Sequence, residues 1–475
     1  MKKVISGLSL ALLLLVAIIG ASSANVPGSG WYFGSTFQNI GSGNANVVIT
    51  AYDSASSNTY TLNQSGLVPG GSFTILPNSA FSPSLPAGFT GSIVASSDQS
   101  LAAVVNITNR ENTSLGVGVA GGRASALYSG VEGTQTSTNI NFPLAKQNLF
   151  NKTTTFYLQN TGSAAATISV TFTIGSSTYP YTSPSVGPGQ MVAIDPGLAG
   201  VPAGSLGSMV ATSAQPIAGI MLEHEHSANP ATVVQGSEGF TPSQLDDTVY
   251  CPVIKDGYFG RETGLQVQNA HTTAQNITVT FQPGNITSTA NNVAPGQSAN
   301  FFQLSNLPSG LYSAVVQGSA GPVAALVSES ELPLVNARQT STTYNCKAQS
   351  QATATVSYPA YKEVYFGRAT GLQIQNVGNT TATNVVVTFN VQGGGTFTTK
   401  PQTIAAGGSI NLVDVRKNSA LWNGAAMGGS TLSGVTITSD QPIIAIINEA
   451  SWTLTGPDNG TTSFDKANAV GFNLP

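Results

Sequence analysis

Apolar and polar residues alternate with a period of two over much of the chain. The alternation is clearest at 265–268 and 277–281, where every second side chain is apolar. This period predicts β-strands in a sheet with one buried and one exposed face. Gly, Pro and Asn interrupt the alternation about every 8–12 residues, and β-branched residues dominate between them. The chain is therefore expected to form short strands joined by turns, and no amphipathic helical period is evident.

The strand pattern recurs in four repeat units. Three segments align without gaps, and each has Pro at its second position, Lys three residues later and Gln-Asn at its end: 142–160, 251–269 and 358–376. A shortened copy that ends in Gln38-Asn39 precedes them. Later in each unit, a turn rich in Gly is followed by two apolar strand patterns that predict a hairpin. The repeat defines four units: 25–133, 134–246, 247–346 and 347–475.

The third unit shows how many strands one unit holds. Its pattern predicts seven: 248–254, 263–269, 276–282, 286–293, 297–304, 310–317 and 322–329. Seven short strands in about 110 residues are typical of an immunoglobulin-like (Ig-like) sandwich. The expected fold class is all-β, a tandem array of four Ig-like β-sandwich modules after a signal peptide.

The signal peptide is predicted from residues 1–24. Lys2-Lys3 precedes an apolar stretch at 8–19, and small residues occupy 22–24, as in secretory leaders. The alternative is an uncleaved anchor, because 4–24 is just long enough to span a bilayer. No second apolar run of that length occurs. We therefore exclude 1–24 from the fold and expect a chain that is secreted, extracellular or on the cell surface, without a membrane span once mature.

Composition narrows the function classes. Only 8% of the 475 residues are charged, against the usual ~25%, so long surface helices and coiled coils are not expected. The sequence pI is about 5.4 and no basic run follows Lys2-Lys3, so nucleic acid is not an expected partner.

The sequence contains few residues that suggest a catalytic or metal-binding site. The chain has three His, and only His224 and His226 lie close together, flanked by glutamates. On a strand both would point to one face, where they could bind zinc or copper with a third ligand. The matching positions in other units are Ser330 and Ala450, which supply none, so a polar strand end is favoured. No catalytic residue and no cofactor are predicted, and the three Trp residues do not recur as a sugar-binding platform.

The two cysteines, Cys251 and Cys346, are predicted to form a disulfide. An exported chain meets oxidising conditions. Cys251 lies on the first strand of the third unit, and Cys346 follows its last predicted strand. First and last strands can be neighbours in a sandwich, so the bond would join the two ends of that unit.

Charged residues recur at matched positions in three units, and we expect them to form structural ion pairs: Lys152 with Glu223, Arg261 with Glu329, and Arg368 with Glu449. The first unit has Ile107 at the acidic position and no basic residue near Ser35. Lysines at a second matched position are rival partners: Lys146, Lys255 and Lys362. These lysines could instead form isopeptide crosslinks with matched asparagines: Asn160, Asn269 and Asn376.

The last segment, 469–475, matches the strand-like segments that precede the shared prolines. Two arrangements follow. Each such strand could complete its own preceding unit, so that the chain is a monomer of four whole units. Alternatively, it could complete the first unit of another copy, giving head-to-tail self-assembly into a filament.

Four motifs carry a family resemblance: Gln-Asn-x-Gly, Asn-x-x-Val-Thr-Phe, a Pro-Gly-Gln turn and Ser-Asp-Gln-Pro-Ile-Ile-Ala at 439–445. Together they resemble the Ig-like repeat modules of secreted prokaryotic surface proteins, of the CARDB-like, cell-adhesion-related type. The resemblance implies a non-enzymatic structural or adhesive protein whose partner is a surface polymer or protein. The alternatives are a secreted carbohydrate- or polymer-binding array, a strand-donating filament subunit, and an enzyme whose site is not recognised.

Overall fold

The computed structural model describes residues 11–18, 26–27, 30–109, 125–227, 233–258, 260–302, 304–331, 341–365, 368–453, 456–457, 466–470 and 472–474. These residues form strands, turns and short 3-10 helices: η1 (Gly133–Gln135), η2 (Pro196–Ala199), η3 (Pro242–Gln244), η4 (Gln349–Gln351), η5 (Val415–Lys417) and η6 (Ser419–Leu421). In this part of the chain, no helix is long and apolar enough to cross a membrane. The all-β class is as predicted.

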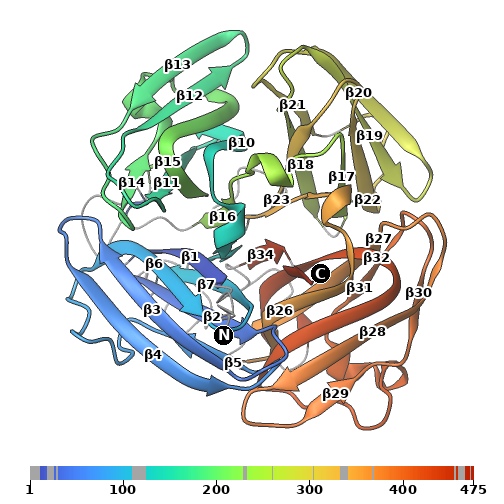
Figure 1. Cartoon of the computed structure of the whole chain (residues 1–475). Helices are drawn as coiled ribbons and strands as arrows, with labels where there is room; N and C mark the ends of the chain where they lie inside the picture. Colours follow the sequence, from blue (N-terminus) through green and yellow to red (C-terminus); the bar gives the residue numbers. More distant parts are fainter. Residues whose placement is uncertain are drawn as a thin grey trace, which may run out of the picture.

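Four units surround a common centre (Figure 1). Unit 1 pairs two sheets. One has the order β4 (Thr59–Leu67), β3 (Ala45–Asp53), β6 (Thr90–Ser97), β1 (Ala11–Ile18) and β9 (Val131–Glu132). The other has the order β5 (Ser72–Ile75), β2 (Trp31–Asn39), β7 (Leu101–Asn109) and β8 (Ser125–Ser129). Both sheets contribute to one hydrophobic core.

Unit 3 repeats this plan. Its five-stranded sheet has the order β20 (Ile286–Val293), β19 (Gln275–Gln282), β22 (Gly310–Gly318), β17 (Thr248–Asp256) and β25 (Lys347–Ala348). Its four-stranded sheet has the order β21 (Ser298–Phe301), β18 (Arg261–Asn269), β23 (Val323–Glu331) and β24 (Ser341–Asn345). The seven predicted strands are present, and β24 and β25 are additions that the pattern did not predict, because both are short.

Units 2 and 4 follow the same plan with one long strand shared by both sheets. Unit 2 contains β10 (Ser137–Gln147), β11 (Lys152–Asn160), β12 (Ile168–Ile174), β13 (Ser177–Thr182), β14 (Met191–Ile194), β15 (Ser205–Glu225) and β16 (Val234–Glu238). Unit 4 contains β26 (Thr353–Glu363), β27 (Arg368–Asn376), β28 (Ala382–Val391), β29 (Thr396–Thr398), β30 (Gln402–Ile404), β31 (Ser409–Leu412), β32 (Thr431–Thr453), β33 (Gly456–Pro457), β34 (Lys466–Val470) and β35 (Phe472–Leu474).

The two strands that were predicted to form a hairpin in each unit do not pair with each other. In unit 2, residues 205–213 of β15 pair with β10 and β12, whereas residues 217–225 pair with β11 and β16. In unit 1 the equivalent strands β6 and β7 lie in different sheets. The chain therefore crosses from one sheet to the other at this point. The two-sheet sandwich agrees with the prediction, but the strand order differs from the ABED and CFG sheets of the Ig fold and does not support the Ig-like assignment.

The N-terminal segment forms β1, although the sequence pattern assigned it to a leader. β1 lies between β6 and β9, in the place that β10, β17 and β26 take in the other units. At the other end of the chain, β34 pairs with β32, and β35 pairs with β26, so both complete unit 4. The described C-terminal strands thus pair within their own unit, as in the first of the two predicted arrangements.

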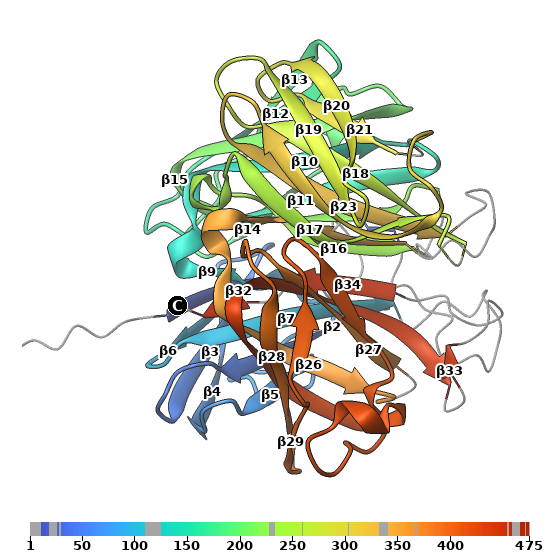
Figure 2. The same ribbon diagram turned by 90° about the vertical axis from the view of Figure 1, so that its right-hand side faces the viewer.

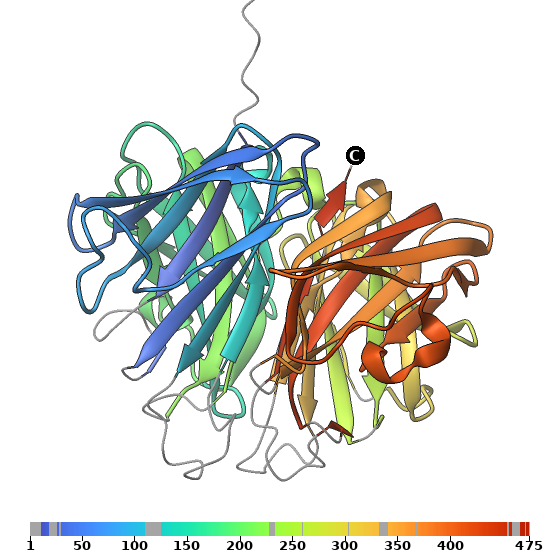
Figure 3. The same cartoon turned by 90° about the horizontal axis from the view of Figure 1, so that it is seen from below.

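The units close into a ring. Around the centre, β8 neighbours β16 and β34, and β24 neighbours the same two strands. β16 and β34 lie at this centre (Figures 1 and 2). One equivalent position in each unit inserts an apolar side chain into the core of the preceding unit: Val104 into unit 4, Ile220 into unit 1, Leu326 into unit 2 and Ile446 into unit 3. Each contact joins two different surfaces, and such contacts form a closed ring when their rotation closes. Figure 3 shows the closing pair, with unit 1 beside unit 4.

Candidate functional site

The recurrent charged residues form three buried triads, each with a glutamate between two cations. In unit 2, Oε2 of Glu223 lies 2.6 Å from Nζ of Lys146, and Oε1 lies 3.3 Å from Nζ of Lys152. Glu329 contacts Lys255 at 2.6 Å and Arg261 at 3.3 Å. Glu449 contacts Lys362 at 2.6 Å and Arg368 at 3.0 Å. The expected pairs therefore form, and the rival lysines join the same glutamates.

Burial and the neighbouring charges shift the pKa values of these groups in opposite directions. Burial works to raise the pKa of Glu223, whose side chain is only 1% exposed, but the adjacent Lys146 and Lys152 hold that pKa down to about 2. Burial lowers the pKa of Lys152, and Glu223 opposes this. Each glutamate balances the charge of two neighbouring cations, and removing one member of such a buried set is costly because the remaining charge is less well compensated.

Unit 1 has an apolar substitute for the triad. Strand register places Trp31 opposite Asn109, where Lys152 stands opposite Glu225, so Trp31 and not Ser35 matches the basic position. Trp31 and Ile107 are both buried in the core of unit 1. Both matched positions of unit 1 are thus apolar and buried, so neither needs a charge on the other to balance it.

The Gln-Asn motif holds the turns of each unit. Nδ2 of Asn160 donates to the carbonyl oxygens of Ala164 and Val186, both at 2.8 Å. Asn39, Asn269 and Asn376 each bind two carbonyls in the same way. These amide groups are occupied by turns while the lysines contact glutamates, so the arrangement does not support the isopeptide alternative.

The glutamine of the motif lies where neighbouring units meet, at contacts that we call joints. Gln159 Nε2 donates to the carbonyl oxygen of Gly189, in the Pro-Gly turn of the same unit, at 2.8 Å. The hydroxyl of Ser92 in unit 1 donates to that carbonyl too, although this Ser was not among the predicted residues. The same joint recurs twice, with Gln268 and Ser208 on Gly296, and with Gln375 and Ser313 on Gly407. The recurrence of Ser near the start of the strand that precedes the sheet crossing, in units 1, 2 and 3, was the available sequence signal.

The closing joint, between units 4 and 1, lacks the Ser. Gln38 donates to the carbonyl oxygen of Gly70 at 3.3 Å, but the position equivalent to Ser92 is Gly434. A Cβ on Gly434 would lie 3.0 Å from that carbonyl oxygen and closer still to Gln38. The fourth joint is thus tighter, and glycine suits the close approach of the two backbones.

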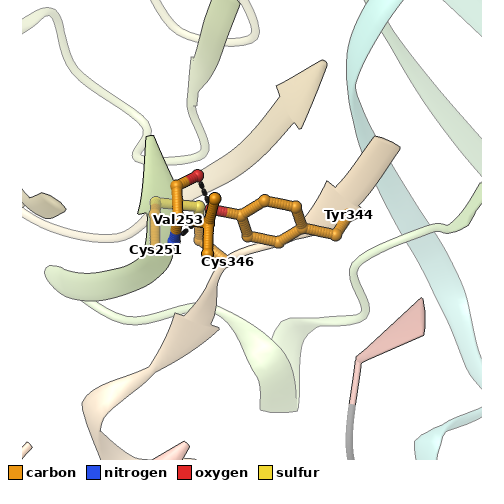
Figure 4. The surroundings of a disulfide bond; sticks show 4 residues. All are labelled: Cys251, Val253, Tyr344 and Cys346. Carbon is orange, nitrogen blue, oxygen red and sulfur yellow. Dashed lines mark hydrogen bonds between the residues drawn. A yellow bond between two sulfur atoms is a disulfide. The ribbon is translucent and has the colours of Figure 1, made fainter. Parts of the chain in front are cut away.

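Cys251 and Cys346 form a disulfide in unit 3, with their Cα atoms 4.6 Å apart. Cys251 lies on β17, and Cys346 lies between β24 and β25. The hydroxyl of Tyr344 accepts from the Val253 amide at 3.0 Å and donates to the Val253 carbonyl at 2.6 Å, beside the bond (Figure 4). The covalent link and the tyrosine together fasten the end of unit 3 to its beginning.

His224 lies near the end of β15 and His226 directly after it, and both contact threonines of the neighbouring β11. Nε2 of His224 is 3.0 Å from the hydroxyl of Thr155, and Nδ1 of His226 is 2.8 Å from that of Thr153. Burial lowers the pKa of His224. Among the described residues, no group of three or more His, Cys, Asp or Glu is placed to hold a metal. Their arrangement is that of a polar strand end.

Two acidic clusters were not predicted. Glu238 lies at the ring centre, where Ser129 of unit 1 and Asn345 of unit 3 donate to its carboxylate. In unit 4, Arg416 contacts both Glu363 and Asp414. Burial, with Asp414 nearby, raises the pKa of Glu363 to about 7. Neither cluster recurs between units, so the repeat comparison gave no signal for them.

The two tryptophans whose side chains the structure describes are buried. Trp31 is 3% exposed and Trp422 is 2% exposed. Trp422 donates its ring N–H to the carbonyl of Val415 at 3.0 Å. The side chain of Trp452 lies outside the described residues.

No family model matches the chain, and no curated protein matches it. Solved structures with a likeness include protein 1070 of Thermotoga maritima (18% identity, TM-score 0.20, 22% of this chain and 93% of that one). Others are an Anabaena sensory rhodopsin transducer (16% identity, TM-score 0.16, 20% of this chain and 92% of that one) and a tetra-tandem repeat from the extending region of a large adhesion protein (14% identity, TM-score 0.11, 96% of this chain and 98% of that one). Likenesses this low assign neither family nor function.

Proposed function

We propose that the chain is a non-enzymatic structural or adhesive protein that acts outside the cell or on its surface. One observation carries the proposal: the polar residues that recur between units serve the fold. The charged residues form buried triads, the asparagines hold turns, and the glutamines with their serine partners join neighbouring units. A repeated catalytic or ligand-binding site would need recurrent polar groups free for chemistry.

The disulfide supports the extracellular assignment. Stable disulfides belong to oxidising compartments and are rare where thiols are kept reduced. Cys251 and Cys346 are the two cysteines of the chain, and they are bonded to each other and buried. The predicted leader points the same way, because a secretory signal delivers the chain to such a compartment.

Binding to surfaces tests the proposal. Fluorescently labelled protein is incubated with intact cells of the source organism, with purified cell-wall polysaccharide and with a glycan array. An adhesive role predicts saturable retention on cells that heat-denatured protein of the same batch does not show. Retention on one polysaccharide class would support the polymer-binding alternative instead. Release of soluble products from any of these materials would show an enzyme and overturn the proposal.

A further inference from the structure

Unit 1 differs from the other units in how its five-stranded sheet is completed. β1 pairs antiparallel with β6 along its whole length, from Ala11 opposite Ser97 to Ile18 opposite Thr90. On its other edge, Leu13 and Leu14 pair with β9. The strand is therefore inserted between two neighbours. We call this place, bounded by β6 and β9, the β1 slot.

The strand in the slot is chemically unlike its counterparts. β10, β17 and β26 carry a proline, and their register shifts at that point. β1 has the sequence ALLLLVAI and keeps its register without a shift. It is also the apolar stretch of the predicted leader. Cleavage after position 24 would remove the strand, so processing and completion of unit 1 compete for the same residues.

The walls of the slot are held by contacts that do not involve β1. β6 pairs along its other edge with β3. On the outer face, Val94 of β6 and Val131 of β9 pack on the same residue of unit 2, Ala218. Ser92 donates to Gly189 of unit 2. Both walls thus contact the neighbouring unit through residues outside β1.

We propose that the β1 slot is a strand-binding site for an extended, apolar, proline-free peptide of about eight residues, which segment 11–18 fills until it is removed. The edge of β6 offers backbone donors and acceptors that must find partners. β6 carries no charged residue, and its inward-facing Ile93 and Ala95 are fully buried, so the occupant must be apolar. Addition of a strand to a sheet satisfies the backbone and lets pockets select side chains.

The main test uses the chain from residue 25 to 475 and a synthetic peptide of residues 11–18 flanked by lysines for solubility. The labelled peptide should bind the shortened chain by fluorescence anisotropy and raise its Tm. The full chain should not bind it, because its slot is filled. A peptide with Leu14→Pro should bind at least about tenfold more weakly, because proline removes a ladder hydrogen bond.

Register gives a sharper readout. Leu14 lies opposite Val94, whereas Leu12 lies opposite Ser96. With Val94→Cys in the shortened chain, a peptide carrying Leu14→Cys should form a disulfide faster than one carrying Leu12→Cys. The native cysteines do not interfere, because they are already bonded to each other. Equal rates, or equal binding of the proline peptide, would overturn the proposal.

A second preparation covers the case in which the shortened chain does not fold. A protease site placed at 20–24, between β1 and β2, is cut in the folded full chain. The proposal predicts that the cut N-terminal fragment stays bound through gel filtration and exchanges with labelled peptide. Immediate release of the fragment, with no change in the Tm of the remainder, would show that no strand site exists. None of these results depends on whether the protein is an adhesin.

Discussion

Each glutamate of the triads sits between two cations, yet unit 1 folds with Trp31 and Ile107 in the matching positions. The charged triad and the apolar residues of unit 1 differ in what happens when one side chain is removed. Removing an apolar side chain leaves a cavity, whereas removing one charge of a buried set leaves an uncompensated charge in a poorly solvating place.

Glu223→Gln should therefore destabilise the protein by about 3–5 kcal/mol, because Lys146 and Lys152 lose their counter-charge. The matched control replaces the whole triad, with Glu223→Ile, Lys146→Met and Lys152→Met, and should recover most of the loss. Both are measured by urea unfolding at pH 7. A cost below about 1 kcal/mol for the single change would mean that the triad behaves like a surface pair.

Glu363 makes the stability depend on pH. Its pKa is raised to about 7 by burial and by Asp414, from 4.5 in the unfolded chain. Between these values the folded state holds a proton that the unfolded state releases, so stability falls as pH rises from 4.5 to 7. The effect amounts to roughly 3 kcal/mol above pH 7.

Glu363→Gln should flatten the stability curve in that window, since the amide does not titrate. Tm is recorded from pH 5 to 8 for the wild type and the variant. Glu225→Gln serves as the control, because that carboxylate lies at an exposed strand end and hydrogen-bonds Asn151. The assignment fails if the variant and the wild type lose stability in parallel across the window.

At the scale of elements, the Gly-containing turn that hydrogen-bonds the end of each Gln-Asn strand forms part of the joint between units. Gly189 and Gly407 occupy equivalent turns with φ of +76° and +70°. A Cβ on Gly189 would collide with the ring of Tyr52 in unit 1, whereas one on Gly407 would meet no atom within 4 Å. An added Cβ would meet the same backbone strain at both positions, but only at Gly189 would it also contact a side chain of the neighbouring unit.

Gly407→Ala should cost only the left-handed conformation, about 1–2 kcal/mol. Gly189→Ala should cost at least ~1 kcal/mol more, because Tyr52 must move. Chemical denaturation of the two variants gives the difference directly. Equal losses would mean that the contact between Gly189 and Tyr52 is loose.

At the scale of the whole molecule, the contacts that close the ring cover the surfaces through which copies of the chain would join head to tail. The contact made by Ile220, Leu326 and Ile446 is made once more by Val104, between the last unit and the first. The C-terminal strands are paired within unit 4. Strand donation to another copy would first have to release these strands from unit 4.

The full chain should therefore be a monomer of 48.4 kDa by light scattering at every accessible concentration. Deleting 466–475 removes β34 and β35, so β8 and β24 each lose one of the two strands, β16 and β34, that they neighbour at the centre. The deletion should lower Tm and increase the binding of a hydrophobic dye. A wild type that polymerises, together with a deletion variant that is a folded monomer, would restore the strand-donation model.

The sequence by itself determined the features that follow from local period and from comparison of the repeats. Strands in unit 3, the matched charges and the positions of Cys251 and Cys346 were all accessible in this way. Each depends on spacing along one chain or on the same residue recurring in several units. The two acidic clusters around Glu238 and Glu363 were not accessible, because they occur once.

Only the tertiary structure decided what covers the second face of each sheet. Gln268 and Thr278 both occupy polar positions in an alternating apolar and polar pattern. Gln268 is nevertheless fully buried, whereas Thr278 is half-buried. An alternating pattern shows that a strand has two faces, but it does not show whether the polar face contacts water or another unit. The joints, the closed ring and the place of β1 depend on units packing together, because each needs surfaces that are distant in sequence to fit.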